Sequence, residues 1–425
     1  MTHDASSSHH RAKDFFLARQ PILNREQGLT AYELLFRSGA VGPAGVVDDL
    51  AATASVIENA SELGLDNVIG ASLGFFNIDT VVLMSDFIQF LPRDKVVLEI
   101  LETVKVTDEV VARVTELAAL GYRFALDDVV ADTPELRRLL PLVEIIKIDI
   151  MGMAQEELTR LYTQFKGANK KMLAEKVETL SDFNFCLGLG FDYFQGYYFA
   201  KPIILTGKKL SPSQLAIMHL MSLIVADADT AVIELAIKQD ASLGLNLLRL
   251  VNTPAFLTSQ RIESLRQALA VLGRRQLQRW LQILLYAAPG KVDSLMSPLL
   301  MLATSRGKLM ELMAQKILPR NQAAADTAFT VGIMSLMETL FSSPMEQILE
   351  QISVVEDVKL ALMDRVGQLG EMLYLVEQIE ALDQNEQAAA LLIPILDKLG
   401  ISKEQLFDMQ VLAFEWSENI SRNAA

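Results

Sequence analysis

The chain has 425 residues, of which 51% are hydrophobic and 21% are charged, so it is long enough for two or three domains and too apolar to be disordered. One cysteine, Cys186, excludes an internal disulfide framework and a cysteine-only metal cluster, and we expect a protein of the reducing cytoplasm. A formal net charge of -15 argues against nucleic acid as a partner, because phosphate backbones need clustered Lys and Arg.

Residues 1–13 are polar and lack the apolar stretch of a secretory signal, so we expect a disordered leader. From residue 14 onward, short apolar runs rich in β-branched residues alternate with amphipathic stretches such as Asp108–Leu120 and Thr133–Leu140. This alternation predicts α/β architecture with a parallel sheet. The clearest predicted strands are Val96–Ile100, Phe124–Leu126 and Ile145–Ile148. No apolar run approaches the roughly 20 residues needed to cross a bilayer, so we expect no membrane span.

The predicted strands end at or beside acidic side chains. The intervals are 28 residues from Glu99 to Asp127, 22 from there to Asp149 and 26 on to Glu175, and each fits one strand-helix unit. If the sheet closes into a barrel, the carboxyl ends of its strands meet at one rim. Glu99, Asp127, Asp128, Asp149 and Glu175 would then converge.

So many carboxylates repel one another, and hard divalent cations such as Mg²⁺ or Mn²⁺ are the usual remedy. Lys147 lies two residues before Asp149 and is predicted on the same strand face, where it would neutralise part of the charge. Two such ions would suit phosphodiester hydrolysis. The alternative, which spacing leaves open, is that these acids cap helices and pair with nearby Lys or Arg.

Beyond about Thr206 the periodicity becomes helical, and we divide the chain there into domains 14–206 and 207–425. The sequence Ser211-Pro212-Ser213-Gln214 is typical of a helix start. The second domain is predicted to be all-α, with helices over Thr230–Lys238, Leu243–Val251, Ser264–Leu272, Gln276–Tyr286, Leu299–Ile317 and Met345–Met363.

Two features of the second domain bear on partners. Arg274, Arg275 and Arg279 lie along one predicted helix beside Trp280, which favours either a solvated helix face or an interaction surface. His219 is the only histidine after position 10, so a multi-histidine hydrolase centre is excluded, and we expect this side chain to pack in the helical core.

The motifs of the first domain resemble those of EAL domains, the cyclic di-GMP phosphodiesterase family. In order, they are Ala18-Arg19-Gln20-Pro21-Ile22, Tyr32-Glu33-Leu34-Leu35-Phe36-Arg37, Phe76-Asn77-Ile78, Leu98-Glu99-Ile100-Leu101-Glu102, Ala125-Leu126-Asp127-Asp128, Ile146-Lys147-Ile148-Asp149, Leu173-Ala174-Glu175-Lys176-Val177-Glu178 and Gly190-Phe191-Asp192-Tyr193-Phe194-Gln195-Gly196-Tyr197. The resemblance implies a modified β/α, TIM-like barrel that binds the cyclic dinucleotide at its rim.

The resemblance also implies roles for individual residues. It makes Mg²⁺ or Mn²⁺ the expected cofactor, with ligands Glu33, Asn77, Glu99, Asp127, Asp128 and Glu175. It places Lys147 beside the scissile phosphate and makes Glu175 the general base. Substrate-contact or supporting positions are Gln20, Arg37, Asp149, Glu178 and Gln195.

Departures from the family pattern favour a degenerate site that is inactive or slow. Val129-Val130-Ala131-Asp132 stands where active relatives have Phe-Gly-Thr-Gly, and β-branched residues do not readily take the positive φ values open to glycine. Glu102 thereby loses the loop it would anchor. Lys176 replaces a glycine and brings a cation close to the acids. Leu34 and Asp79 also depart from the motifs.

The second domain is similar to HDOD modules, helical relatives of metal-dependent phosphohydrolases. The similar stretch runs from Ala236-Ile237-Lys238-Gln239-Asp240 through Leu247–Phe256 to Leu272-Gly273. We therefore expect a bacterial signalling protein that is α/β plus all-α, whose helical domain binds a protein partner. The alternative is an active enzyme that hydrolyses cyclic di-GMP to linear pGpG. The oligomeric state stays open, a homo-oligomer included.

Overall fold

The computed structural model describes residues 15–38, 65–196, 212–253, 262–286, 298–341, 343–352, 354–382 and 388–424. The predicted leader and the predicted boundary at Thr206 lie outside these residues. The described chain forms two compact units. The barrel unit contains residues 15–196 together with Tyr374–Ile420, and the helical unit runs from residue 212 to Leu373.

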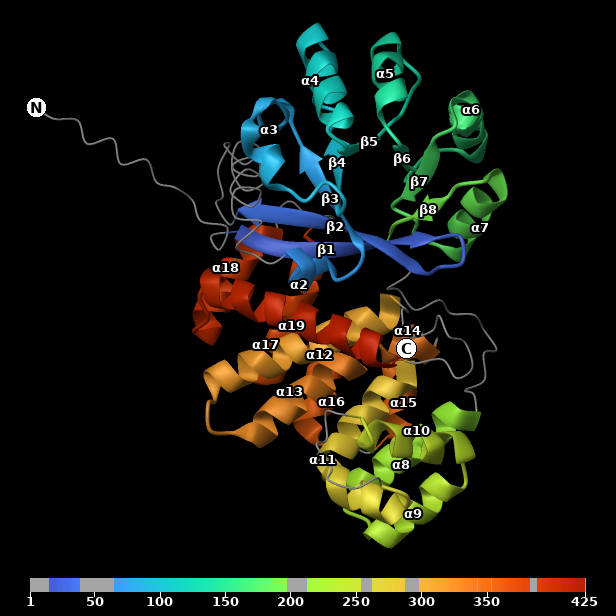
Figure 1. Cartoon of the computed structure of the whole chain (residues 1–425). Helices are drawn as coiled ribbons and strands as arrows, with labels where there is room; N and C mark the ends of the chain where they lie inside the picture. Colours follow the sequence, from blue (N-terminus) through green and yellow to red (C-terminus); the bar gives the residue numbers. More distant parts are fainter. Residues whose placement is uncertain are drawn as a thin grey trace, which may run out of the picture. The chain divides into compact units, whose positions relative to one another are not determined.

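The barrel unit is built on a closed eight-stranded barrel, as predicted (Figure 1). Its strands are β1 (Phe15–Asn24), β2 (Leu29–Ser38), β3 (Leu73–Ile78), β4 (Val96–Ile100), β5 (Arg123–Leu126), β6 (Ile145–Asp149), β7 (Lys171–Glu175) and β8 (Tyr193–Phe194). Strands β2 to β8 run parallel to one another, whereas β1 is antiparallel to both β2 and β8.

The barrel interior is a layer of apolar side chains supplied by every strand. The layer consists of Ile22, Ala31, Phe75, Val97, Ala125, Ile145 and Leu173, packed with the partly buried Leu73 and Tyr193. Because side chains alternate between the two faces of a strand, residues two positions away share this inward direction. The layer therefore sets the direction of the polar residues that follow it at the mouth of the barrel.

The predicted helices Asp108–Leu120 and Thr133–Leu140 are confirmed as α4 (Asp108–Ala119) and α5 (Pro134–Leu139). Each begins after a threonine, Thr107 or Thr133, whose hydroxyl accepts a backbone hydrogen bond from the first turn. The other helices of this part are α2 (Leu65–Ile69), α3 (Thr80–Met84), η2 (Asp86–Phe90), η3 (Leu140–Leu142), α6 (Gln155–Phe165), η4 (Lys166–Ala168) and α7 (Leu180–Leu189).

Two C-terminal helices, α18 (Ala388–Leu399) and α19 (Lys403–Ala424), belong to the barrel unit up to Ile420. This corrects the sequence-based domain limits, which assigned all of 207–425 to one helical domain. The physical reason is that β1 and β2 form a hairpin with no helix between them, and α19 covers their outer face (Figure 1). Buried side chains on α19 repeat at helical spacing, from Leu406 through Gln410 and Ala413 to Ser417.

Within its described residues the helical unit is all-α, as predicted. Its helices are α8 (Pro212–Val225), α9 (Thr230–Lys238), α10 (Ala241–Val251), α11 (Leu265–Tyr286), α12 (Pro298–Ile317), α13 (Gln322–Met334), α14 (Met337–Phe341), α15 (Met345–Gln351), α16 (Glu356–Asp364) and the start of α17 (Gly367–Glu380). The predicted helix Met345–Met363 is in fact two helices, α15 and α16. His219 is exposed on α8 instead of packed in the core.

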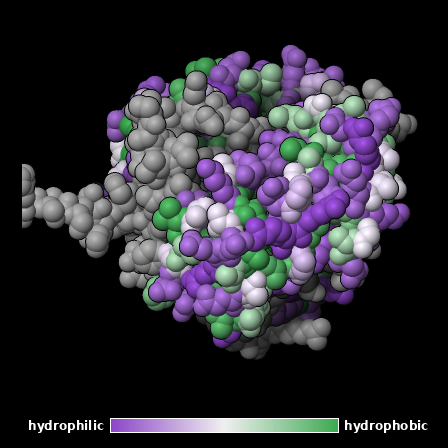
Figure 2. Space-filling model, turned by 90° about the horizontal axis from the view of Figure 1, so that it is seen from above, coloured by the Kyte–Doolittle hydropathy of each residue, from purple (hydrophilic) through white to green (hydrophobic). Residues whose placement is uncertain are grey.

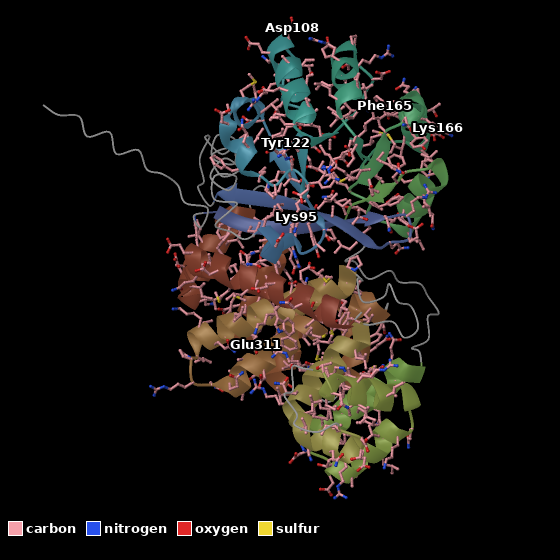
Figure 3. The ribbon with its side chains drawn as sticks, in the orientation of Figure 1. Lys95, Asp108, Tyr122, Phe165, Lys166 and Glu311 are labelled. Atoms are coloured by element: carbon pink, nitrogen blue, oxygen red, sulfur yellow. The ribbon has the colours of Figure 1, made fainter. Side chains whose placement is uncertain are left out.

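The arginines of α11 are held by ion pairs within the helical unit. Arg279 forms a two-pronged pair with Glu311 of α12, at 2.9 and 2.6 Å, and its guanidinium lies 3.8 Å from the ring centroid of Phe329. Arg275 pairs with Asp326 at 2.6 Å. Figure 3 shows Glu311 among the helices of this unit. These contacts favour the reading of α11 as a helix face that is satisfied within the unit.

The face of the chain seen from above is mixed in character among the residues that the structure describes (Figure 2). In the view from above, Figure 2 shows hydrophilic residues over most of the visible face, with hydrophobic residues scattered between them. Among the residues that the structure describes, no helix is long and apolar enough to cross a membrane.

Candidate functional site

Eight polar side chains gather at one mouth of the barrel. Each lies two residues from a member of the apolar layer and so points inward on the same face: seven follow their layer residue, whereas Gln20 precedes Ile22 because β1 is antiparallel. They are Gln20, Glu33, Asn77, Glu99, Asp127, Lys147, Glu175 and Gln195. Strand pairing sets Gln20 opposite Glu33 and Asn77 opposite Glu99. The register of the barrel therefore assembles residues that are up to 175 positions apart in the chain.

The Lys147 ammonium lies where the carboxylates of this mouth converge. Its Nζ is 2.8 Å from Glu99 Oε1, 2.9 Å from Asp127 Oδ1 and 2.9 Å from Glu175 Oε1. Glu33 Oε2 is 3.4 Å away. The side chains of Lys147 and Glu99 are only 1% and 0% exposed. One buried cation thus holds four acids in a space that water hardly reaches.

Amide side chains complete the arrangement around Glu33. Gln195 Nε2 donates to Glu33 Oε2 at 2.7 Å and to Gln20 Oε1 at 2.6 Å, and Asn77 Nδ2 donates to Glu33 Oε1 at 3.0 Å. Gly196 holds φ at 152°, and a Cβ there would lie 2.3 Å from the backbone nitrogen of Val177. Only glycine permits this close approach, which sets where Gln195 enters the site.

Burial and mutual repulsion shift the pKa values of the cluster. Burial and the neighbouring charge of Glu33 raise the pKa of Glu99 well above its usual value. Burial raises the pKa of Glu175 to about 8, against the opposing effect of Lys147. Although burial disfavours a charged Lys147, the surrounding carboxylates raise its pKa well above the ordinary lysine value. Lys147 is therefore a permanent cation here.

Family models match both parts of the chain. Residues 4–202 match the EAL domain and residues 212–360 match the HDOD domain. The protein named cyclic di-GMP phosphodiesterase CdgJ, from Vibrio cholerae, is 35% identical over 415 residues, which are 96% of this chain and 93% of that relative. The chain belongs to the EAL family and carries an HDOD domain after its EAL domain.

Other proteins resemble this EAL-HDOD chain. The uncharacterized protein YuxH of Bacillus subtilis is 31% identical over 412 residues, covering 95% of this chain and 98% of YuxH. Among solved structures, a standalone EAL protein from Vibrio cholerae O395, in its c-di-GMP bound form, is 25% identical. That match covers 44% of this chain and 92% of the other, with a TM-score of 0.36.

Two further acids of the EAL domain, Asp128 and Asp149, lie beside the cluster of Lys147. Asp149 Oδ1 accepts a hydrogen bond from the Met151 backbone at 2.8 Å, and its Oδ2 pairs with Lys176 Nζ. Burial, followed by the charges of Asp149 and Asp127, raises the pKa of Asp128. Asp149 therefore forms its ion pair with Lys176 and none with Lys147.

Two residues of the EAL site have backbone conformations that favour glycine. Asp128 has φ of 44° and Lys176 has φ of 52°. Asp tolerates this region better than most residues, whereas Lys does not, so the backbone at Lys176 is strained by roughly 1 kcal/mol. This position is the one where the resemblance to EAL domains places a glycine.

The loop after Asp128 takes a shape of its own. Positive φ falls on Asp128, whereas Val129 is buried and its backbone nitrogen donates to the Lys147 carbonyl at 3.0 Å. Asp132 then pairs through both oxygens with Arg137, at 2.9 and 2.7 Å. Glu102 is exposed and has no hydrogen bond or ion pair to the residues that the structure describes. The loop is thus anchored by Asp132 and not by Glu102.

The structure brings together most residues that the sequence and the resemblance singled out. Glu178 follows β7 and is exposed. Arg37 lies in β2 opposite Phe16, and its side chain falls outside the described residues. Spacing alone did not find Glu33, Asn77 or Gln195. Each of the three lies two residues after an apolar side chain of the barrel layer. This relation could have identified them, but it can be recognised only once the pairing register of the strands is known.

The chemistry of the donor set fits a hard divalent cation. Both carboxylate oxygens of Glu99 and the Oδ1 of Asn77 are buried without a hydrogen-bond partner, although Glu99 Oε1 lies close to Lys147. Buried oxygens with free lone pairs are the ligands that Mg²⁺ and Mn²⁺ prefer. As they stand, no three His, Cys, Asp or Glu side chains of the described residues form a ready metal site. Lys147 lies between the acids instead.

Proposed function

We propose that the EAL domain is a cyclic di-GMP phosphodiesterase that acts with Mg²⁺ or Mn²⁺. The observation that carries this proposal is the placement of Lys147 within 2.9 Å of Glu99, Asp127 and Glu175 at the barrel mouth. The likeness to CdgJ over nearly the whole chain supports the same substrate class. A cyclic dinucleotide is an anion, and the four acids outnumber the single charge of Lys147, so a divalent cation held among them would supply the positive charge that a phosphate needs.

The residues proposed to hold the cation are Glu33, Asn77, Glu99, Asp127, Asp128 and Glu175. When bound, a divalent cation polarises a phosphoryl oxygen and lowers the pKa of a water ligand. The strongest support for this assignment is that Glu99 Oε2 and Asn77 Oδ1 are buried without a hydrogen-bond partner, while Glu99 Oε1 contacts only the Lys147 ammonium.

The chain's own side chains supply the remaining chemistry. Lys147 presents a fixed positive charge that stabilises the negative charge growing on the phosphate in the transition state. The Glu175 carboxylate, in contact with Lys147, is proposed to accept the proton of the attacking water. Gln20 and Gln195 offer amide groups at the mouth, and Arg37, Asp149 and Glu178 are proposed to contact substrate or support those that do.

The test is hydrolysis by the full chain with cyclic di-GMP and Mn²⁺. We expect wild type to form linear pGpG, and Glu175→Gln to lower the rate by about 100-fold or more, the usual contribution of a general base. Glu144→Gln is the matched control, because Glu144 is exposed at the opposite end of the neighbouring strand β6. Equal rates for the two variants would contradict the assignment of Glu175.

A second candidate function is a sensor that binds cyclic di-GMP without hydrolysing it. It is favoured by the pairing of Lys176 with Asp149 and by the valine loop, which departs from the glycine loop of active relatives. Titration calorimetry separates the two functions. Binding of cyclic di-GMP without any metal-dependent pGpG would support the sensor, and no heat at high ligand concentration would contradict both.

For the helical unit we propose a protein-binding role. Its single histidine, His219, supplies no set of imidazole ligands for the hydrolase centre of related helical proteins. Its arginines on α11 are engaged with acids of the same unit, so we place the proposed partner surface elsewhere on the unit. Sedimentation of the full chain over a concentration series tests the simplest partner, a second copy of the chain.

A further inference from the structure

The outer side of the β1–β2 hairpin is covered by the end of the chain. β1 pairs with β8 only through Leu23 and Asn24, so no described strand pairs with that edge of β1 from Phe15 to Ile22. An open strand edge exposes unpaired backbone groups and is normally covered. Here Gln410 Nε2 of α19 donates to the Leu17 carbonyl at 2.6 Å, and both residues are buried.

A buried arginine joins the outer face of the hairpin to the same helix. The Arg19 guanidinium lies 4.3 Å from the ring centroid of Tyr32 in β2 and 4.0 Å from that of Phe414 in α19. It donates to the Val68 carbonyl at 2.5 Å and lies 3.4 Å from Glu418 Oε1. The Arg19 and Glu418 side chains are 6% and 7% exposed, so truncating either one removes a stabilising contact from a buried charge.

These contacts lie one residue away from the functional site. Arg19 points outward and is followed by Gln20, which points into the barrel mouth. Tyr32 likewise points outward and is followed by Glu33. Gln20 and Glu33 both accept from the same Gln195 amide, so their bonds depend on the placement of the hairpin.

We propose that α19 is a positioning element for the site, with Arg19 and Phe414 as positioning residues that hold β1 and β2 so that Gln20 and Glu33 meet Gln195. Docking of α19 and binding of ligand at the mouth are then coupled, and each strengthens the other. The ligand part of this inference rests on the proposed function. Residues 212–373 of the helical unit lie in the chain between the barrel strands and α19, with the end of α17 and α18 before α19 begins.

The test uses the full chain carrying Trp280→Phe, which leaves Trp416 of α19 as the single tryptophan. Phe414→Ala removes one face of the Arg19 stack, and Leu412→Ala, at a 50% exposed position of the same helix, is the matched control. Glu418→Gln keeps the shape of its side chain and serves as a milder variant. Trp416 fluorescence emission reports the docking of α19, and the rate of backbone amide hydrogen exchange reports the stability of β1 and β2. Calorimetry in the presence of Ca²⁺ measures the affinity for cyclic di-GMP.

We expect Phe414→Ala to speed exchange in β1 and β2 and to weaken cyclic di-GMP binding by about tenfold, while Leu412→Ala changes each less than about twofold. Saturating cyclic di-GMP should in turn slow exchange in α19, an effect that a purely structural contact would not produce. The inference would be overturned if Phe414→Ala loosened the docking of α19 without changing the affinity for cyclic di-GMP. It would also be overturned if cyclic di-GMP did not change the rate of hydrogen exchange in α19.

A wild-type chain that binds no cyclic di-GMP contradicts the proposed function separately. Hydrogen exchange then decides the positioning inference alone. Faster exchange of β1 and β2 in Phe414→Ala than in Leu412→Ala then supports the structural half of the inference, that α19 holds the hairpin, and equal exchange in the two variants overturns it.

Discussion

Lys176 combines a strained backbone with a charge at the edge of the acidic site. Its φ of 52° suits glycine, and its ammonium pairs with Asp149. The lysine side chain is 51% exposed, so this ion pair contributes little stability and does not offset the backbone strain. Its charge nevertheless opposes a divalent cation beside Asp128 and Asp149.

Replacing Lys176 should therefore raise metal affinity. We expect Lys176→Gly to tighten Mn²⁺ binding about fivefold, a change of about 1 kcal/mol, because it removes a cation near the site. It should also leave stability unchanged or slightly higher. Lys176→Gln is the control that removes the charge and keeps the strained backbone. Calorimetric Mn²⁺ titrations in which both variants match wild type would contradict a role for this charge.

The ion pairs of Glu311 predict how the stability of the helical unit depends on pH. Burial opposes its charge, but hydrogen bonds and charge from Arg279 and Lys308 lower its pKa below the usual value. A carboxyl group with a lowered folded pKa contributes stability above the unfolded value of about 4.3, and this stability is lost as the pH falls through the folded pKa. The contribution should be complete at pH 7 and decline below about pH 4.

The variant Glu311→Gln should lose that contribution and leave Arg279 without its anion. We expect a loss of about 3 kcal/mol at pH 7, as for a buried pair that is cut on one side, and a smaller loss at acidic pH. Glu346→Gln, at an exposed position of α15, is the control and should change stability very little. Denaturant unfolding at pH 7 and pH 4 measures both, and a loss that stays constant with pH would contradict the assignment.

Single residues show where prediction from sequence was sufficient. Period-two alternation and the spacing of acids found Glu99, Asp127 and Glu175, because strand ends meet at one rim in any parallel barrel. The same reasoning placed Asp149 in that group, but Lys176 draws it to a separate pair. Which lysine neutralises which acid depends on side-chain geometry at the scale of a hydrogen bond, and spacing does not contain it.

At the scale of elements, helical periodicity predicted which segments are helical more reliably than it predicted where one helix ends and the next begins. The stretches Ser264–Leu272 and Gln276–Tyr286 are two helical segments, as predicted, separated by non-helical backbone at Gly273 inside α11. By contrast, the single helix predicted over Met345–Met363 is two helices, because α15 ends at Gln351, Ile352 is extended, and α16 begins at Glu356. The apolar face continues across this second break, so periodicity did not locate it.

Two helical glycines allow the packing of elements to be tested with opposite signs. A Cβ at Gly332 of α13 would lie 2.6 Å from the Cα of Gly307 in α12, whereas a Cβ at Gly244 of α10 would meet Leu265 at an ordinary 3.6 Å. Gly332→Ala should cost about 1–3 kcal/mol through overpacking. Gly244→Ala should gain up to about 1 kcal/mol from helix propensity. Chemical denaturation of the two variants checks the contrast, and equal effects would show that the close helix crossing is wrong.

For the whole molecule, sequence predicted two kinds of architecture but misplaced the end of the chain. The amphipathic pattern of α19 indicates that one face is buried and does not say against what. Its partner is a hairpin almost 400 residues earlier, joined through Leu17 and Arg19. Contacts between residues so distant in sequence leave no periodic signal in the sequence. Only the fold reveals that α19 packs on the β1–β2 hairpin and belongs to the barrel unit.

This arrangement predicts which parts of the chain unfold together. Scanning calorimetry of the full chain should show one transition lowered by Phe165→Ala, a buried barrel-unit residue labelled in Figure 3, and another lowered by Gly332→Ala. Although Phe414 is near the C-terminus, Phe414→Ala should lower the transition that Phe165→Ala lowers and leave the other unchanged, because α19 is part of the barrel unit. If Phe414→Ala instead lowers the Gly332 transition, α19 unfolds with the helical unit and the barrel does not depend on it.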